Sequence, residues 1–147
     1  MPDARPVSGY VLSFDFGFRR IGVAVGQTLT GTATPLETVR HGQAPDWPAI
    51  ERLATEWKPA LFVVGLPLAE DGSDSDMSLA ARRFGAELAG RFGLPVEYVD
   101  ERLTSRVAGQ RFAEQRATGA ARRKDASRLD AVAAQLICEN WLREQRG

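Results

Sequence analysis

The sequence predicts an α/β domain with a mixed central sheet flanked by helices. Three short apolar segments follow one another near the start with only turns between them, which is typical of an antiparallel meander. Further along, short apolar strands alternate with amphipathic helices, which indicates a sheet with helices packed on its faces. We therefore expect three antiparallel strands followed by two parallel strands. With 147 residues, the chain is expected to form one domain, 1–147, whose polar lead-in at 1–8 frays.

The three strands of the meander are expected at 9–15, 20–27 and 32–40. In the second strand, apolar residues alternate with glycine and alanine, as in a strand with two different faces. Pro35 interrupts the third strand and has no backbone N–H to donate, so this strand is expected at an edge of the sheet.

The later elements are predicted from hydrophobic spacing. The run at 60–65 is continuously apolar, as in a strand buried on both faces. Asp74 or Asp76 is expected to cap the helix that follows, and Gly93 to end it. In chain order, we expect a helix at 47–57, a strand at 60–65, a helix at 77–92, a strand at 96–99 and helices at 104–117 and 126–143.

The composition excludes several classes of protein. The formal net charge is zero, so any attraction to nucleic acid must come from a local patch. Cys138 is the single cysteine, which excludes an internal disulfide and a zinc site of several cysteines. No apolar run approaches the roughly 18–20 residues of a membrane helix, and no signal peptide or P-loop motif is recognisable. The expected location is the cytoplasm.

Acidic residues follow two of the predicted strands. Asp15 ends the first strand, and Asp100 and Glu101 directly follow the last. Asp130 borders the apolar stripe of the final helix. If that helix crosses the strand ends, carboxylates from distant parts of the chain meet, and their repulsion calls for a hard cation such as Mg²⁺ or Mn²⁺. Ordinary solvent-exposed acids would give the same pattern, so spacing alone leaves both readings open.

Four ordered motifs resemble the YqgF/RuvX family, within the RNase H-like superfamily. The family's Asp-x-Gly-x-(Lys/Arg)-Arg-Ile-Gly-Val-Ala is matched at 15–24, and its Val-Val-Gly-Leu-Pro at 63–67. This second motif continues with Asp-Gly-Ser at 71–73, and the third and fourth are Asp-Glu-Arg-Leu-Thr at 100–104 and Asp-Ala-x-Ala-Ala at 130–134. Together these motifs span nearly the whole chain.

The resemblance implies an RNase H-like fold and metal-assisted hydrolysis of phosphodiester bonds. It implies Asp15, Glu101 and Asp130 as the catalytic acids and as ligands of Mg²⁺ or Mn²⁺, with Asp100 able to replace or orient Glu101. The implied substrate is the 5′ end of precursor 16S ribosomal RNA or a Holliday junction. Two departures from the pattern are Phe18, where a small or polar residue is expected, and the lack of a second acid one turn from Asp130.

Basic residues gather in the segment 102–128, which holds eight arginines and lysines against Glu114 and Asp125. This asymmetry is typical of a phosphate-binding face, although a solvated helix face has the same composition. The residues expected to bind nucleic acid are Arg20, Arg102, Arg122, Arg123, Lys124 and Arg128.

Other functions stay open at this point. The chain is expected to be a monomer or a homodimer, and a stable dimer would favour a junction resolvase, which needs two paired sites. The Asp-x-Gly turn also resembles the phosphate-binding turn of actin-like ATPases, and a ribosome-assembly factor without catalytic activity would keep the same fold. His41 lies in a loop with no visible partner, and no catalytic role is assigned to it.

Overall fold

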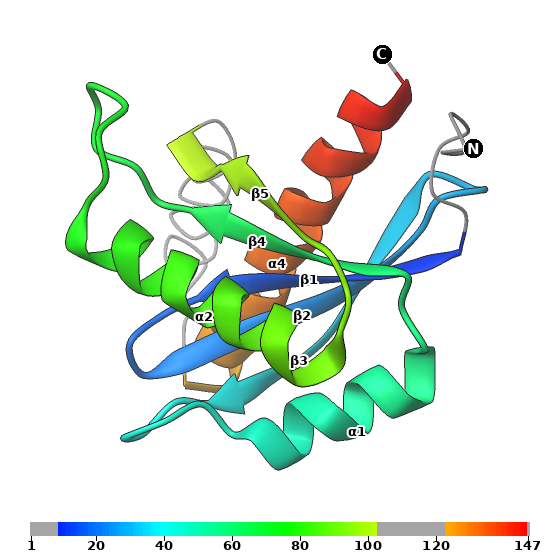
Figure 1. Ribbon diagram of the computed structural model, residues 1–147, viewed down its shortest axis with the longest axis horizontal. Helices are drawn as coiled ribbons and strands as arrows, with labels where there is room; N and C mark the ends of the chain where they lie inside the picture. Colours follow the sequence, from blue (N-terminus) through cyan, green and yellow to red (C-terminus); the bar gives the residue numbers. More distant parts are fainter. Residues whose placement is uncertain (1–8, 103–122, 147) are drawn as a thin grey trace.

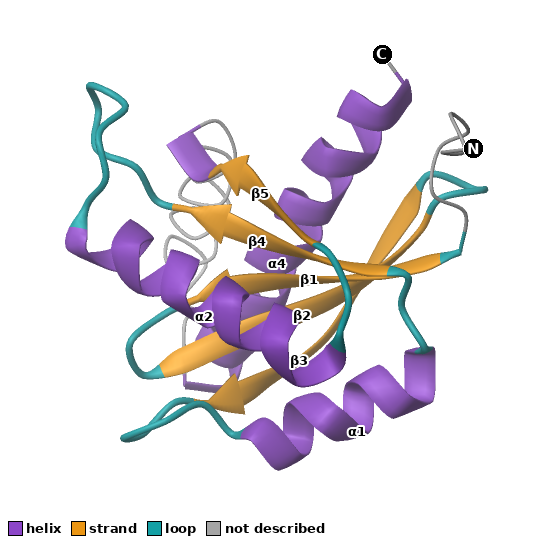
Figure 2. Cartoon of the chain, in the orientation of Figure 1, coloured by secondary structure: helices purple, strands orange, loops and turns teal. Residues whose placement is uncertain are grey.

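The computed structural model describes residues 9–102 and 123–146. These residues form a five-stranded mixed sheet with helices on both faces (Figures 1 and 2). The strands are β1 (Tyr10–Phe16), β2 (Arg20–Gln27), β3 (Thr32–Arg40), β4 (Leu61–Leu66) and β5 (Val96–Asp100). The helices are α1 (Trp47–Trp57), α2 (Asp76–Phe92) and α4 (Arg123–Arg146).

The sheet has the strand order β3-β2-β1-β4-β5. The first three strands pair antiparallel, whereas β4 runs parallel to both β1 and β5. This arrangement confirms the predicted sheet. Pro35 lies on the edge strand β3, as expected, and a bulge there leaves Leu36 without a partner between the pairs formed by Pro35 and Glu37.

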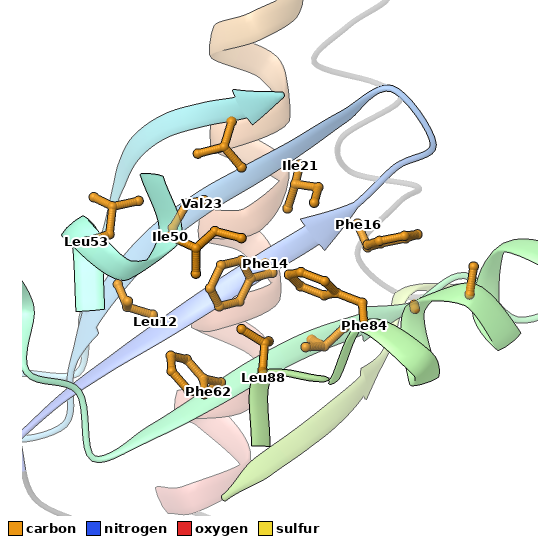
Figure 3. Close-up of a cluster of buried hydrophobic side chains, with 14 of the residues drawn as sticks. Leu12, Phe14, Phe16, Ile21, Val23, Ile50, Leu53, Phe62, Phe84 and Leu88 are labelled. Carbon is orange, nitrogen blue, oxygen red and sulfur yellow. The ribbon is translucent and has the colours of Figure 1, made fainter. Parts of the chain in front are cut away.

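The helices cover the two faces of the sheet unequally. Helices α1 and α2 pack on one face, and α4 crosses the other (Figure 1). Because successive side chains of a strand point to opposite faces, Phe14 and Phe16 face α1 and α2, and Asp15 faces α4. The larger core lies on the α1/α2 face, where Phe14 and Phe84 meet edge to face at 5.4 Å (Figure 3).

The helix ends show one correction. Ser75, and not Asp74 or Asp76, caps α2: its side chain accepts a hydrogen bond from the Ser78 N–H, and the Ser78 hydroxyl binds the Ser75 N–H in return. Asp74 instead accepts from the Ser78 hydroxyl and pairs with Arg82, because it lies one residue before the extended cap position. Gly93 ends α2 in the left-handed conformation, as predicted.

Several predictions fall on residues that the structure does not describe. The helix at 104–117 and the lead-in at 1–8 lie outside the described residues. Helix α4 begins at Arg123, three residues before the predicted start at 126. Within 9–102 and 123–146, no helix is long and apolar enough to cross a membrane.

Candidate active site

The candidate site lies on the α4 face of the sheet, at the end of β1. Asp15 is the penultimate residue of this strand and pairs across the antiparallel ladder with Gly22 of β2. On the other side, Phe14 pairs with Val64, so Asp15 and Gly65 are the next residues along the two parallel strands. The carboxylate of Asp15 therefore stands between two glycines, with no side chain beside it on either neighbouring strand.

Glu101 reaches this position from the end of β5. Its side chain bends over Gly65, where an added Cβ would lie 2.8 Å from the Cγ and Cδ atoms of Glu101. Glu101 is only 7% exposed. A glycine on β4 thus makes room for an acid from the strand beside it, and that acid lies against Asp15.

The carboxyl groups of half-buried Asp15 and buried Glu101 share a hydrogen bond. Burial raises the pKa of Glu101 to about 10, helped by the negative charges of Asp15 and Asp100. Burial also raises the pKa of Asp15, and Asp130 adds to this rise, while the bond to Glu101 opposes it. With both pKa values raised, the pair retains a proton that the two carboxyl groups share. Two acids that share one proton are typical of sites where a neighbouring cation can replace that proton.

Asp130 approaches from α4. The backbone of this helix packs directly on β2, because Gly22 has no side chain and a Cβ there would overlap the carbonyl of Asp130. The Asp130 Oδ2 atom forms an ion pair with Nε of Arg20 at 2.8 Å. Burial raises the pKa of Asp130, whereas the positive charge of Arg20 lowers it.

Asp100 points into a different environment from Glu101. The Arg102 guanidinium binds both of its carboxylate oxygens, at 2.6–3.0 Å, and this pairing lowers the pKa of Asp100. Arg102 also donates to the carbonyl of Glu70 at 3.0 Å, which ties the loop after β4 to the end of β5. Of the two adjacent acids, Glu101 is therefore the one that lies beside Asp15.

The chemistry of these acids fits a hard divalent cation, but the cluster is incomplete as it stands. Asp15 and Glu101 offer buried carboxyl oxygens, which are the ligands that Mg²⁺ and Mn²⁺ prefer. The buried Oδ2 of Asp130 makes no hydrogen bond of standard geometry within the described part of the chain, although Arg20 lies close. Among the described residues, no three acidic, histidine or cysteine side chains are gathered as ligands.

The structure describes only some of the residues that are predicted to bind nucleic acid. Arg20 and Arg128 are exposed, and Arg20 lies at the site itself. Arg102 is engaged with Asp100 and Glu70. Arg122 lies outside the described residues, as do the side chains of Arg123 and Lys124, although the backbone of the latter two begins α4.

Sequence reasoning missed residues that shape the site without providing chemistry. Gly22 and Gly65 are examples, and glycine inside a strand is a known sign of close approach by another part of the chain. The interpretation of His41 as a residue without a partner was wrong. Its Nδ1 atom lies 2.7 Å from the carbonyl oxygen of Gly17, and its ring lies 5.0 Å from that of Phe16.

The chain is similar to curated proteins over nearly its whole length. The protein is 47% identical over 138 residues to a protein of Aeromonas salmonicida named "Putative pre-16S rRNA nuclease", covering 93% of this chain and 96% of that one. It is 47% identical over 145 residues to a protein of Xanthomonas campestris with the same name, covering 97% and 94%.

Two solved structures share the fold. One is T. thermophilus RuvC in complex with a Holliday junction substrate, with a TM-score of 0.55, 18% identity and coverage of 92% of this chain and 96% of that one. The other is the yeast mitochondrial Holliday junction resolvase Ydc2, with a TM-score of 0.54, 11% identity and coverage of 99% and 82%. The RNase H-like fold is thereby confirmed. The family model described as "RuvX: Holliday junction resolvase" matches residues 9–144, and the chain belongs to this family.

Proposed function

We propose that this chain is a metal-dependent nuclease that hydrolyses phosphodiester bonds in RNA and processes the 5′ end of precursor 16S ribosomal RNA. One observation carries the proposal: the hydrogen-bonded carboxyl pair of half-buried Asp15 and buried Glu101 at the end of β1. Asp130 faces the same side of the sheet from α4.

The burial of this pair is costly for the fold. An unpaired charge removed from water costs several kcal/mol, and apolar residues at the same positions would pack without that penalty. Strong pKa shifts that arise from burial and from a specific charged neighbour are concentrated at functional sites. The Asp15–Glu101 pair, for which Gly22 and Gly65 make room, therefore supports a chemical role better than a structural one.

The proposed cofactor is Mg²⁺ or Mn²⁺, held by Asp15, Glu101 and Asp130. When bound, such a cation activates water and neutralises charge on the phosphate that is attacked. Glu101 must first lose its proton to act as a ligand. Arg20 neutralises part of the charge of Asp130 and presents a half-exposed guanidinium, which can bind a phosphate group at the edge of the site.

The names of the relatives support RNA as the substrate and, with it, a cytoplasmic place of action. A second candidate is resolution of Holliday junctions, favoured by the description of the family and by the substrate of the T. thermophilus structure. Both reactions use the same acids. They differ in the shape of the substrate and in the number of sites, because a four-way junction is cut at two paired positions.

The test is cleavage by the purified full-length chain. A precursor 16S 5′ fragment and a four-way DNA junction are each incubated with Mg²⁺ or Mn²⁺, and with EDTA as the metal-free control. Asp15→Asn, Glu101→Gln and Asp130→Asn should each abolish cleavage, whereas Glu56→Gln, which changes an exposed acid on α1, should not. A folded protein that cuts neither substrate, or an Asp15→Asn variant with full activity, would overturn the proposal.

A further inference from the structure

A pocket of about 310 Å³ opens beside the turn that joins β1 to β2. Aromatic rings dominate its lining: Phe16 from the end of β1, Phe18 from the turn and His41 from the segment after β3. Phe84 of α2 closes the inner wall, and Arg83 and Glu87 of the same helix stand at the rim. The volume lies at the lower end of the roughly 300–1,000 Å³ typical of small-molecule sites, so it suits one flat ring system.

Phe18 is the unusual member of this set. Its side chain is 54% exposed, although a phenylalanine is strongly favoured inside a protein. Its ring meets the ring of Phe16 edge to face, with the centroids 6.3 Å apart. Packing therefore does not explain a ring at this position, and one face of it is left open to the pocket.

The turn that carries Phe18 is held in place. His41 fixes the carbonyl of Gly17 through its ring nitrogen and the carbonyl of Arg19 through its backbone N–H, at 2.7 and 3.0 Å. The His41 ring in turn lies against Phe16. An exposed aromatic side chain on a turn that is bonded on both sides can receive a ligand with little loss of conformational freedom.

The pocket and the acids share one end of the sheet. Phe16 directly follows Asp15, but the two side chains point to opposite faces. Exposed arginines lie around this end: Arg19 in the turn, Arg83 at the rim of the pocket, and Arg20 opposite Arg40 in the β2–β3 ladder. A polyanion cut at Asp15 can therefore meet arginine side chains as it passes over the turn, although Arg20 is paired with Asp130 and Glu87 also lines the pocket.

We propose that this pocket binds an unpaired nucleobase of the RNA substrate, stacked on Phe18, close to the phosphodiester bond that is cut. The inference rests on the proposed function for the identity of the polymer. It deepens that function, because a base can enter the pocket only where it is free of its complementary strand. The site would thus direct cleavage to single-stranded or unpaired segments of a structured RNA. Stacking on an aromatic side chain tolerates every base, so no sequence preference is expected.

The test measures binding apart from cleavage. A fluorescently labelled single-stranded oligoribonucleotide, and the same sequence annealed to its complement, are titrated with the full-length protein in EDTA. Phe18→Ala should weaken binding of the single strand by about 5- to 100-fold, the range expected for one stacked base, and change duplex binding little. Phe18→Trp should keep the affinity. Leu29→Ala removes another exposed apolar side chain, in the turn after β2, and should have no effect.

Each outcome decides a separate point. Equal single-strand affinity of Phe18→Ala and Leu29→Ala would overturn the pocket proposal, even if the wild-type chain cleaves precursor RNA. An equal loss on single strand and duplex would also overturn it, because Phe18 would then act only through the shape of the turn. Conversely, a Phe18-dependent preference for single strands in a protein that never cleaves would support the pocket and refute the nuclease.

Discussion

The Nε atom of Arg20 lies 2.8 Å from Oδ2 of Asp130, and this ion pair joins the start of β2 to helix α4 at the edge of the carboxylate site. The guanidinium is half exposed, so the pair itself contributes little to stability. Its main effect is electrostatic, because the Arg20 guanidinium occupies the Asp130 oxygen that a metal ion would need as a ligand. If Asp130 binds a metal ion as proposed, Arg20 would compete with that ion for the carboxylate.

Replacing Arg20 by glutamine is expected to tighten Mn²⁺ binding, because Asp130 loses its competing partner, and to weaken RNA binding in EDTA. The free energy of unfolding should change by less than about 1 kcal/mol. Isothermal titration with Mn²⁺, titration of labelled single-stranded RNA in EDTA and urea denaturation measure the three quantities. Arg52→Gln is the matched control, since it breaks an ion pair of similar exposure between α1 and β3. If both variants bind Mn²⁺ with wild-type affinity, Asp130 is not a ligand.

The proton on Glu101 makes the stability of the metal-free protein depend on pH. Because the folded protein holds the pKa of Glu101 at about 10, well above that of the unfolded chain, the folded state binds the extra proton. The stability that this proton contributes is fully present below the ordinary pKa range of a carboxyl group, and it is lost as pH rises toward about 10. The loss approaches about 1.4 kcal/mol per pH unit for one proton.

The variant Glu101→Gln should remove this part of the pH dependence and be more stable than wild type at about pH 8–9. Urea denaturation in EDTA at a series of pH values gives the comparison, with the exposed Glu56→Gln as control. Parallel curves for wild type and Glu101→Gln would show that Glu101 is already ionised in the folded protein.

Metal binding should release a proton and become tighter as pH rises, since Glu101 must ionise to act as a ligand. We expect the affinity for Mn²⁺ to increase by up to about tenfold per pH unit below the pKa of Glu101. Titration calorimetry in two buffers of different ionisation enthalpy measures the proton released. Asp15→Asn should abolish the binding. Affinity that does not vary with pH would mean that the cation binds elsewhere.

Gly22→Ala should disrupt the site without changing any functional group. A methyl group there would overlap the carbonyl of Asp130 and push α4 off β2, at a cost of about 1–3 kcal/mol or more. Metal binding should weaken with it. Gly90→Ala is the matched control: it lies in α2 with open space around it, so the substitution should stabilise by about 0.5–1 kcal/mol. Thermal unfolding of both variants tests the pair, and equal melting temperatures would contradict the packing.

The sequence predicted the strands to within about a residue of their ends, because short alternating or continuous apolar runs between turns leave little choice of register. The cap of α2 was missed, since Asp74, Ser75 and Asp76 are all good capping residues and only the backbone conformation selects one. The hydrogen bond between His41 and the carbonyl of Gly17 was also missed. The two residues lie 24 positions apart in the sequence, and strand pairing brings them together.

The candidate site was predictable in its acids but not in its arrangement. Motif resemblance singled out Asp15, Glu101 and Asp130, yet it left Asp100 and Glu101 as alternatives. The side chains of neighbouring residues at a strand end point in different directions, and the motif does not show which of them points toward Asp15. The structure distinguishes the two acids: Arg102 binds Asp100, whereas Glu101 forms a hydrogen bond with Asp15. The engagement of Asp130 with Arg20 depends on how α4 crosses the sheet, which no local pattern encodes.

The absence of a side chain at Gly65 has a consequence for how this chain tolerates genetic variation. In a library of all single substitutions, position 65 should score as severely as the acids themselves, although it carries no reactive atom. Any replacement would occupy the space that the Glu101 side chain fills. Ranking residues by chemical reactivity would pass over this position, whereas ranking them by the damage of substitution would place it beside Asp15.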